Sequence, residues 1–292
     1  MASAAHLPAA SGDGTDEGGH RRHFLRLPFR LRLGLTGVVI TLGAALLLPL
    51  VVSGAFAMSP TAILAPPSLH FPMGADAYGR SVLSRVLLGM RVSYAIGLSV
   101  SLATLFIGGC VGLLTGYFPV ADAIVMRFVD AIMSVPSVMI ALATATVFGA
   151  SVINTIVVLS LFYAPRTARV MRSAVFAVRE TAFVEAARAL GGRTARILWR
   201  HVVPNTISPL IIQQTFIMAY AILGEAVFSY IGVGVPPPTP SLGNILSEAQ
   251  QVIYQDPGLS VFPGACIAAI VISVNLVGDG IRDLFDVHVR DL

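Results

Sequence analysis

The sequence predicts an all-α membrane protein with several spanning helices, and composition is the first reason. Of its 292 residues 55% are hydrophobic and only 12% are charged, whereas an ordinary soluble domain is about 25% charged. The charged residues also cluster. They leave six stretches without Asp, Glu or Arg, each long enough to hold the roughly 20 apolar residues that cross a bilayer, at 33–75, 92–121, 131–165, 201–224, 226–247 and 257–278.

The same composition excludes several kinds of chemistry. All 19 basic residues are arginines, so a lysine-containing phosphate loop and a lysine Schiff base are both absent, and any ATP must be bound by another chain. Cys110 and Cys266 lie in apolar stretches outside any C-x-x-C pattern, which argues against a metal site or a disulfide framework. No serine–histidine–aspartate or paired-carboxylate arrangement can be assembled, so we expect no enzyme active site. The net charge of +4 does not indicate nucleic-acid binding, because the arginines flank apolar segments.

The apolar stretches divide the chain as follows. Residues 1–32 are expected to be a disordered, basic cytoplasmic tail, 33–58 a first transmembrane helix and 59–92 an extracytoplasmic connection. A permease core with five further helices would fill 93–292. We expect helices at roughly 93–117, 208–233 and 258–281, and two more that share 131–165 with a turn at Gly149-Ala150-Ser151. The second of those two continues past Pro165 and Arg166, whose side chain can reach the membrane surface.

The first apolar run has a second interpretation. Arg21-Arg22, an apolar stretch and Ala55-Phe56-Ala57 also resemble a cleavable export signal. The run of 25 residues from Leu33 to Ala57 exceeds the roughly 7–15 apolar residues of such a signal. We therefore treat it as a spanning helix.

The arginines predict the orientation. With these spans, sixteen of them fall on the side that holds both chain ends, and three, Arg80, Arg85 and Arg91, fall on the other. Because arginine is enriched in cytoplasmic connections, both termini and the 164–204 connection are expected in the cytoplasm.

That cytoplasmic connection contains a short helix with a distinctive pattern. Thr181 is suited to cap its start, and Gly191-Gly192 to end it. Between them an apolar face is formed by Phe183, Ala186, Ala187 and Leu190. A second short helix shows Arg193, Arg196 and Arg200 along one side. Such a segment can insert into a groove on a partner protein or lie on anionic headgroups, and the pattern alone does not separate the two.

Glu185-Ala186-Ala187, followed by Gly191 and by His201-Val202-Val203-Pro204-Asn205, resembles the E-A-A loop of ABC-importer membrane subunits. It is most similar to the second, C-type permease of the dipeptide/oligopeptide/nickel subfamily. Further ordered similarities extend from residue 70 to the C-terminus, with Ala75, Ser81 and Leu242 standing where Thr, Asp and Trp are usual. The similar segments are, in chain order, Phe71–Asp76 with Gly79-Arg80 and Ser84-Arg85, Arg127–Asp130 with Val135-Pro136-Ser137, Pro237–Asn244, and Asn275–Asp283.

The resemblance implies a six-helix, type I ABC importer (MetI-like) permease in the bacterial inner membrane. It implies that the segment 174–204 couples this subunit to cytoplasmic ATPases, which would hold ATP and magnesium, while this chain needs no cofactor. The other implied partners are a homologous second permease, an extracytoplasmic solute-binding protein and membrane lipid, with no nucleic acid. The coupling residues would be Glu185, Ala186, Ala187, Leu190 and Gly191.

Dipeptides or oligopeptides are the cargo expected from this class, with nickel or another small molecule as alternatives. Glu225 is the acidic residue deep in a predicted span, and three roles are open: a place in the substrate pathway, a hydrogen bond between helices, or an interfacial position. Gln214 and Asn275 are further pathway candidates, although such side chains more often join helices.

Two other function classes fit the sequence less well. A self-contained secondary transporter or channel would carry several buried ionisable residues and internal repeats, and the chain shows one such carboxylate and no clear repeat. A membrane scaffold would explain the hydrophobicity but not the ordered similarities.

Overall fold

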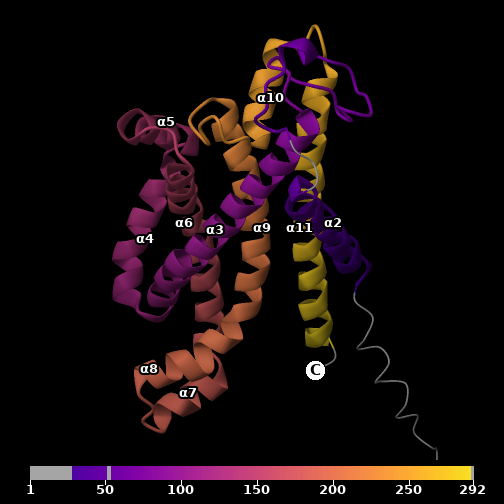
Figure 1. The fold of residues 1–292 in the computed structure, drawn as a ribbon. Coiled ribbons are helices and arrows are strands. Elements are labelled where there is room, and N and C mark those ends of the chain that lie inside the picture. Colours follow the sequence, from indigo (N-terminus) through magenta and orange to yellow (C-terminus); the bar gives the residue numbers. More distant parts are fainter. Residues whose placement is uncertain (1–27, 51–53, 291–292) are drawn as a thin grey trace, which may run out of the picture.

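The computed structural model describes residues 28–50 and 54–290, and within them the chain is helical (Figure 1). The all-α class is confirmed. In the described part, one isolated β-bridge joins Ala75 to Ser81. The helices are α2 (Phe29–Leu47), α3 (Val82–Tyr117), α4 (Pro119–Ser134), α5 (Ser137–Phe148), α6 (Val152–Arg179), α7 (Ala182–Ala189), α8 (Thr194–Ile197), α9 (Val203–Tyr230), α10 (Leu242–Gln251) and α11 (Gly258–Arg290), with short 3-10 segments at Leu48–Leu50 and Pro60–Ala62 and a π-helical segment at Leu198–Val202.

The first two long helices differ in extent from the sequence prediction. Helix α2 begins at Phe29, inside the segment predicted to be disordered; residues 1–27 lie outside the described part. Its 3-10 extension ends at Leu50, and residues 54–59 are not helical, so the predicted end near residue 58 is wrong. Pro49 lacks the N–H that an α-helix needs, which weakens the helix here.

Helix α3 begins eleven residues before the predicted position 93. The side chain of Ser81 accepts a hydrogen bond from the backbone N–H of Ser84 and so caps the helix at its start. The connection predicted for 59–92 is therefore correspondingly shorter. The early start was hidden by Arg85 and Arg91, which interrupt the apolar run in the sequence but not the helix.

The predicted count of six spanning helices is met only in part. Among the residues that the structure describes, four helices are long and apolar enough to cross a membrane: Phe29–Leu50, Val82–Tyr117, Thr194–Tyr230 and Gly258–Phe285. The α4–α5 pair raises the number to five if it is counted as one span. Helix α6 is long enough, but Arg166 and Arg169 lower its hydropathy.

The third span, predicted in the first part of 131–165, corresponds to α5 and the last residues of α4, and most of α4 precedes the predicted span. Helices α4 and α5 meet at an angle of 83°, and α5 turns away from α4 above α6 (Figure 1). Pro136 explains the break, because a proline disfavours helical backbone in the residue before it, and Val135 is extended. The predicted turn after this pair is confirmed: α5 ends at Gly149, which has a φ of 80°, and Ser151 caps α6.

Helices α3 and α6 pack lengthwise at very short distance, and three glycines of α3 make this possible. Gly108, Gly112 and Gly116 lie against the backbone and side chains of 164–175 in α6. A Cβ built on Gly112 would lie 2.5 Å from the Ala168 carbonyl oxygen. The small-residue stripe therefore sets how closely the two helices approach.

Gly112→Ala is expected to lower the free energy of unfolding by about 1–3 kcal/mol, because the added methyl overpacks the α3–α6 contact. Thermal unfolding of the detergent-purified subunit measures this. The matched control is Gly109→Ala, since nothing lies within 4 Å of a Cβ there. Equal midpoints for the two variants would contradict the packing argument.

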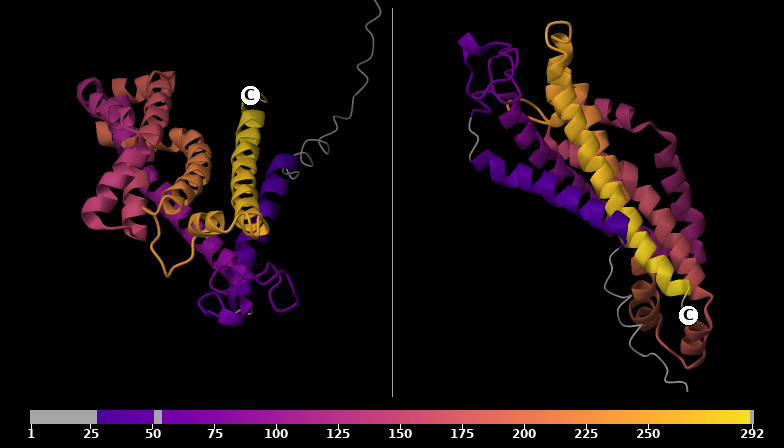
Figure 2. Two further views of the ribbon diagram at one scale, coloured as in Figure 1. Left: turned by 90° about the horizontal axis from the view of Figure 1, so that it is seen from above. Right: turned by 90° about the vertical axis from the view of Figure 1, so that its right-hand side faces the viewer.

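Different segments occupy the two ends of the helical bundle. The connection 54–81 and α10 lie at one end, and the α7–α8 segment projects from the other (Figures 1 and 2). Helices α2 and α11 pack together, with Gly34 against the backbone of Leu276 and Val277.

Candidate functional site

The projecting end is formed by α7, α8 and the π-helical segment. Thr181 precedes α7 in extended conformation, and Glu185 lies in its first turn. Gly191, with a φ of 76°, follows the helix, so the predicted glycine stop is confirmed. The predicted side-chain cap is wrong: the Thr181 hydroxyl donates back to the Val178 carbonyl oxygen at 2.6 Å instead of accepting from α7.

The two sides of α7 have different surroundings. Val184 is fully buried and Ala187 is half-buried. Phe183, Ala186 and Leu190 face outward, with Leu190 89% exposed. We call these three residues the α7 outer face. Val184 belongs to a hydrophobic cluster with residues from α6, α8, the π-helical segment and α9: Met171, Val175, Ile197, Val202 and Leu210.

Three of the four residues predicted to form one apolar face are therefore exposed, although the Phe183 ring lies 6.2 Å from the His201 ring. Glu185 is exposed beside them, as is Gly191. Val184, which the periodicity analysis did not select, anchors the helix instead. A folded, apolar and exposed helical face is typical of a surface that a partner protein covers.

The base of α7 is tied to the ends of three long helices. The Arg188 guanidinium lies 5.3 Å from the centre of the Tyr117 ring, at the end of α3. Arg179 donates to the carbonyl oxygens of Gly116 and Tyr117 at 3.3 and 3.4 Å. Together with the cluster around Val184, these contacts connect α7 to α3, α6 and α9. A displacement of α7 would thus be passed to all three.

The three arginines predicted along the second short helix, Arg193, Arg196 and Arg200, are exposed. Trp199 is also exposed, at 70%. The α8 side of this segment therefore offers positive charge and an aromatic ring beside the α7 outer face.

Glu225 is completely buried between α3, α9 and the start of α10. The Ser93 hydroxyl donates to Oε2 at 2.8 Å, and the Ser229 hydroxyl donates to Oε1 at 2.7 Å. Ser241, the capping residue of α10, is also fully buried, and its hydroxyl accepts from the Asn244 backbone N–H at 3.1 Å. Among the three roles considered from the sequence, this geometry supports the hydrogen bond between helices.

Gln214 and Asn275 occupy different surroundings. The side-chain oxygen Oε1 of Gln214 accepts from the Thr104 hydroxyl at 3.0 Å, and its side-chain nitrogen Nε2 donates to the Thr167 hydroxyl at 3.2 Å. Gln214 thus joins α9 to α3 and α6. Asn275 lies half-buried on α11. The structure does not bring Glu225, Gln214 and Asn275 together, and their proposed contact with cargo stays a prediction.

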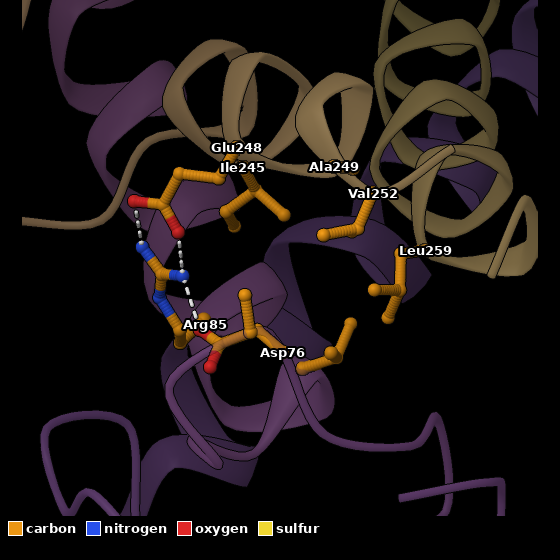
Figure 3. A pocket seen from close by; sticks show the side chains of 9 residues that line it. Asp76, Arg85, Ile245, Glu248, Ala249, Val252 and Leu259 are labelled. Atoms are coloured by element: carbon orange, nitrogen blue, oxygen red, sulfur yellow. Dashed lines mark hydrogen bonds and ion pairs between the residues drawn. The ribbon is translucent and has the colours of Figure 1, made fainter. Parts of the chain in front are cut away.

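A second cluster, which the sequence analysis did not anticipate as an ion-pair network, lies at the opposite end (Figure 3). Arg85 contacts Asp76 at 2.6 Å and Glu248 at 2.5 Å. Arg80 contacts the same two carboxylates, each at 2.7 Å. The network joins the connection before α3 to α10, across 163 residues of sequence. A small pocket beside it is lined by Ile245, Ala249, Val252 and Leu259.

The environment of Asp76 holds its pKa below the ordinary value. Burial acts in the opposite direction, but the backbone N–H groups of Arg80 and Tyr78, the Arg80 side chain and the charge of Arg85 together outweigh it. A carboxyl whose folded-state pKa is depressed stabilises the fold above its unfolded pKa of about 3.9, and this stabilisation is lost as pH falls through the lower folded value.

We therefore expect the wild-type subunit to lose more thermal stability than Asp76→Asn between pH 7 and pH 3. The comparison is made by thermal unfolding in detergent across that range. Parallel loss in the two proteins would show that Asp76 is not linked to acid stability.

Within residues 28–50 and 54–285, no three His, Cys, Asp or Glu side chains are grouped so that they could hold a metal ion.

Comparison with known proteins finds consistent similarities. The family profile described as "Binding-protein-dependent transport system inner membrane component" matches residues 108–291. A dipeptide transport system permease protein of Alkalihalophilus pseudofirmus is 32% identical over 260 residues, which cover 87% of this chain and 86% of that protein. A di/tripeptide transport system permease protein of Pseudomonas aeruginosa is 35% identical over 237 residues, covering 81% and 78%.

Among solved structures, an inward-facing methionine ABC transporter contains a chain with the same fold. The TM-score is 0.55 at 20% identity, and the match covers 65% of this chain and 91% of that one. The predicted MetI-like fold is confirmed by this similarity.

Proposed function

This chain belongs to the family of binding-protein-dependent transport system inner membrane components, and from that premise we propose that it is a permease subunit of an ATP-driven peptide importer. The relatives that match over most of its length carry the names of dipeptide and di/tripeptide permeases. Dipeptides and short peptides are accordingly the cargo that we assign to it. The chain itself would supply part of the pathway and no catalysis.

The observation that carries the coupling role is the α7 outer face. Phe183, Ala186 and Leu190 are exposed on a short helix whose opposite side is anchored by Val184. A cytoplasmic ATPase that covers this face would sense or drive the position of α7. Glu185, Ala186, Ala187, Leu190 and Gly191 would form the contact, and ATP with magnesium would be bound by the ATPase subunits.

The route from this contact to the membrane follows the packing. Arg188 on Tyr117 links α7 to α3, and the Arg179 hydrogen bonds link α6 to α3. The Val184 cluster links α7 to α6 and α9. ATP binding that draws the ATPases together would move these helix ends and convert the pathway between outward-facing and inward-facing states. A second, homologous permease would supply the other half of the pathway.

The same assignment sets the topology. The protein is a multi-pass membrane protein, and we assign both termini and α7 to the cytoplasm on the distribution of its arginines. The connection 54–81 and α10 would then face outward, where an extracytoplasmic solute-binding protein delivers cargo.

The test is purification of the complex from its native membrane in mild detergent, followed by identification of the copurifying chains by mass spectrometry. A second permease of similar length and an ATPase are expected. The complex is then reconstituted in vesicles with its solute-binding protein, and uptake of a dipeptide is measured with and without ATP.

Uptake of dipeptide that requires both ATP and the binding protein would support the proposal. A chain that purifies alone and transports without ATP would replace it with a secondary carrier. ATP-dependent uptake of nickel but not of dipeptide would retain the importer class and overturn the cargo.

A further inference from the structure

The arginines of α6 are neutralised unequally. Arg169 pairs with Asp130 at 2.6 Å, Arg172 pairs with Asp122, and Arg179 pairs with Glu180 at 2.9 Å. Arg166 forms no ion pair or hydrogen bond with any residue of the described part of the chain. Its positive charge is therefore uncompensated by the residues that the structure describes.

Arg166 is instead held by two aromatic rings. Its guanidinium carbon lies 5.5 Å from the centre of the Tyr163 ring and 5.4 Å from the centre of the Tyr220 ring. The two rings are stacked, with centres 6.3 Å apart, and the Tyr163 hydroxyl donates to the Tyr220 carbonyl oxygen at 3.1 Å. Such cation–π contacts position an arginine without using its N–H donors.

Arg166 lies on the part of α6 that packs against the glycines of α3. Gly108 of α3 contacts Ala164 and Thr167 of α6, so Arg166 is level with that glycine. Gly108 lies nine residues before the end of α3 at Tyr117, about 14 Å at 1.5 Å per residue. A charged arginine that faces lipid is costly, so a half-buried arginine without a counterion is suited to contact with a polar partner or ligand.

The aromatic pair is open on one side. Tyr163 is 8% exposed and Arg166 is half-buried, whereas Tyr220 is 46% exposed. The cluster thus lies at the surface of this chain, between α6 and α9. The sequence had suggested that Arg166 extends toward the membrane surface, but its two ring contacts direct it toward α9.

We propose that Arg166, Tyr163 and Tyr220 form a subsite for the carboxylate of cargo in the translocation pathway, namely the C-terminal carboxylate of a peptide. The inference rests on the proposed function and specifies a binding site within it. Guanidinium N–H groups bind a carboxylate in bidentate fashion, and the exposed Tyr220 ring offers a surface for the adjoining peptide group. A single charge–charge contact suits a pathway site, because cargo must also leave.

The test uses the complete transporter, reconstituted in vesicles with its solute-binding protein. Uptake of Ala-Ala is compared with uptake of its C-terminal amide, each supplied at saturation of the binding protein as determined by separate titration. In Arg166→Gln, uptake of the free acid is expected to fall about tenfold, while uptake of the amide is unchanged. The control Arg169→Gln, which removes an exposed and paired arginine of the same helix, should leave the ratio of the two rates as in the wild type.

A second measurement does not depend on delivery of the peptide by the solute-binding protein. Saturation-transfer NMR on the detergent-purified permease–ATPase complex, without the binding protein, should detect Ala-Ala with the wild type and lose the signal with Arg166→Gln.

Three outcomes would overturn the subsite. Equal loss for acid and amide would make Arg166 structural, unchanged uptake of both would make it dispensable, and loss of the second permease on purification would show that it pairs with a carboxylate of that subunit. If the wild type transports neither peptide, the peptide function itself fails, and that failure is seen before any variant is compared.

Discussion

Leu190→Glu is expected to abolish ATP-dependent uptake while leaving the subunit folded. Leu190 is 89% exposed, so the substitution disturbs little within this chain. In the assembled importer it would place a carboxylate at the centre of an apolar contact with the ATPase. Loss of such a contact residue typically costs about 2 kcal/mol or more, roughly 30-fold in affinity. Copurification of the ATPase and peptide-stimulated ATP hydrolysis are the measurements.

Leu69→Glu is the matched control, because Leu69 is a fully exposed leucine in the connection at the opposite end of the bundle. It should retain the ATPase. If Leu190→Glu also retains the ATPase and full uptake, α7 is not the docking helix, and the headgroup-bound alternative for this segment would be favoured.

Arg85→Ala is expected to be the most destabilising single substitution at the outer end. The Arg85 side chain is 4% exposed and contacts two carboxylates. Its removal leaves the Asp76 and Glu248 carboxylates close together with less positive charge between them, so they repel one another more strongly. Breaking a buried ion pair from one side costs about 3–5 kcal/mol. Thermal unfolding of the purified subunit should show a correspondingly lower midpoint.

Arg91→Ala tests whether that loss is specific. Arg91 is an exposed arginine on the same helix, so its removal should change the midpoint little. A double variant, Arg85→Met with Glu248→Leu, should recover part of the stability, because apolar residues of similar volume can replace a buried pair. Failure to recover any would indicate that Arg85 acts mainly through packing.

Much of the fold was predictable because its determinants are local. The apolar runs located α2, α9 and α11, and glycines at 149 and 191 marked two helix ends that the structure confirms. The break between α4 and α5 was not predicted, although Pro136 was visible, because composition alone does not give the angle at which two helices meet. The sequence prediction started α3 too late, because a charged residue such as Arg85 suggests the end of a membrane span unless the carboxylates that pair with it are known.

The sequence identified the segment that holds the candidate site, but not which of its side chains are exposed and which are buried. Helical periodicity grouped Phe183, Ala186, Ala187 and Leu190 into one apolar face for a partner or the membrane surface, but it did not identify Val184 as the residue that anchors α7. The inner side depends on Ile197, Val202 and residues of α6 and α9, which are distant in sequence. The network of Asp76, Arg80, Arg85 and Glu248 likewise joins residues far apart in the chain, and no local pattern reports such a pairing.

The glycine contacts between α3 and α6 have a mechanical consequence. Ala168 and Met171 lie so close to Gly112 that the two helices cannot slide past one another without a clash, and they would move as one rod. Helix α3 has 36 residues, a length of about 54 Å. Rotated by about 10° around its cytoplasmic end, a rod of that length carries its far end about 9 Å. The glycine contacts therefore keep α3 and α6 rigid relative to each other. A small rotation at their cytoplasmic ends would produce a large displacement at the opposite end of α3, where Arg85 contacts α10.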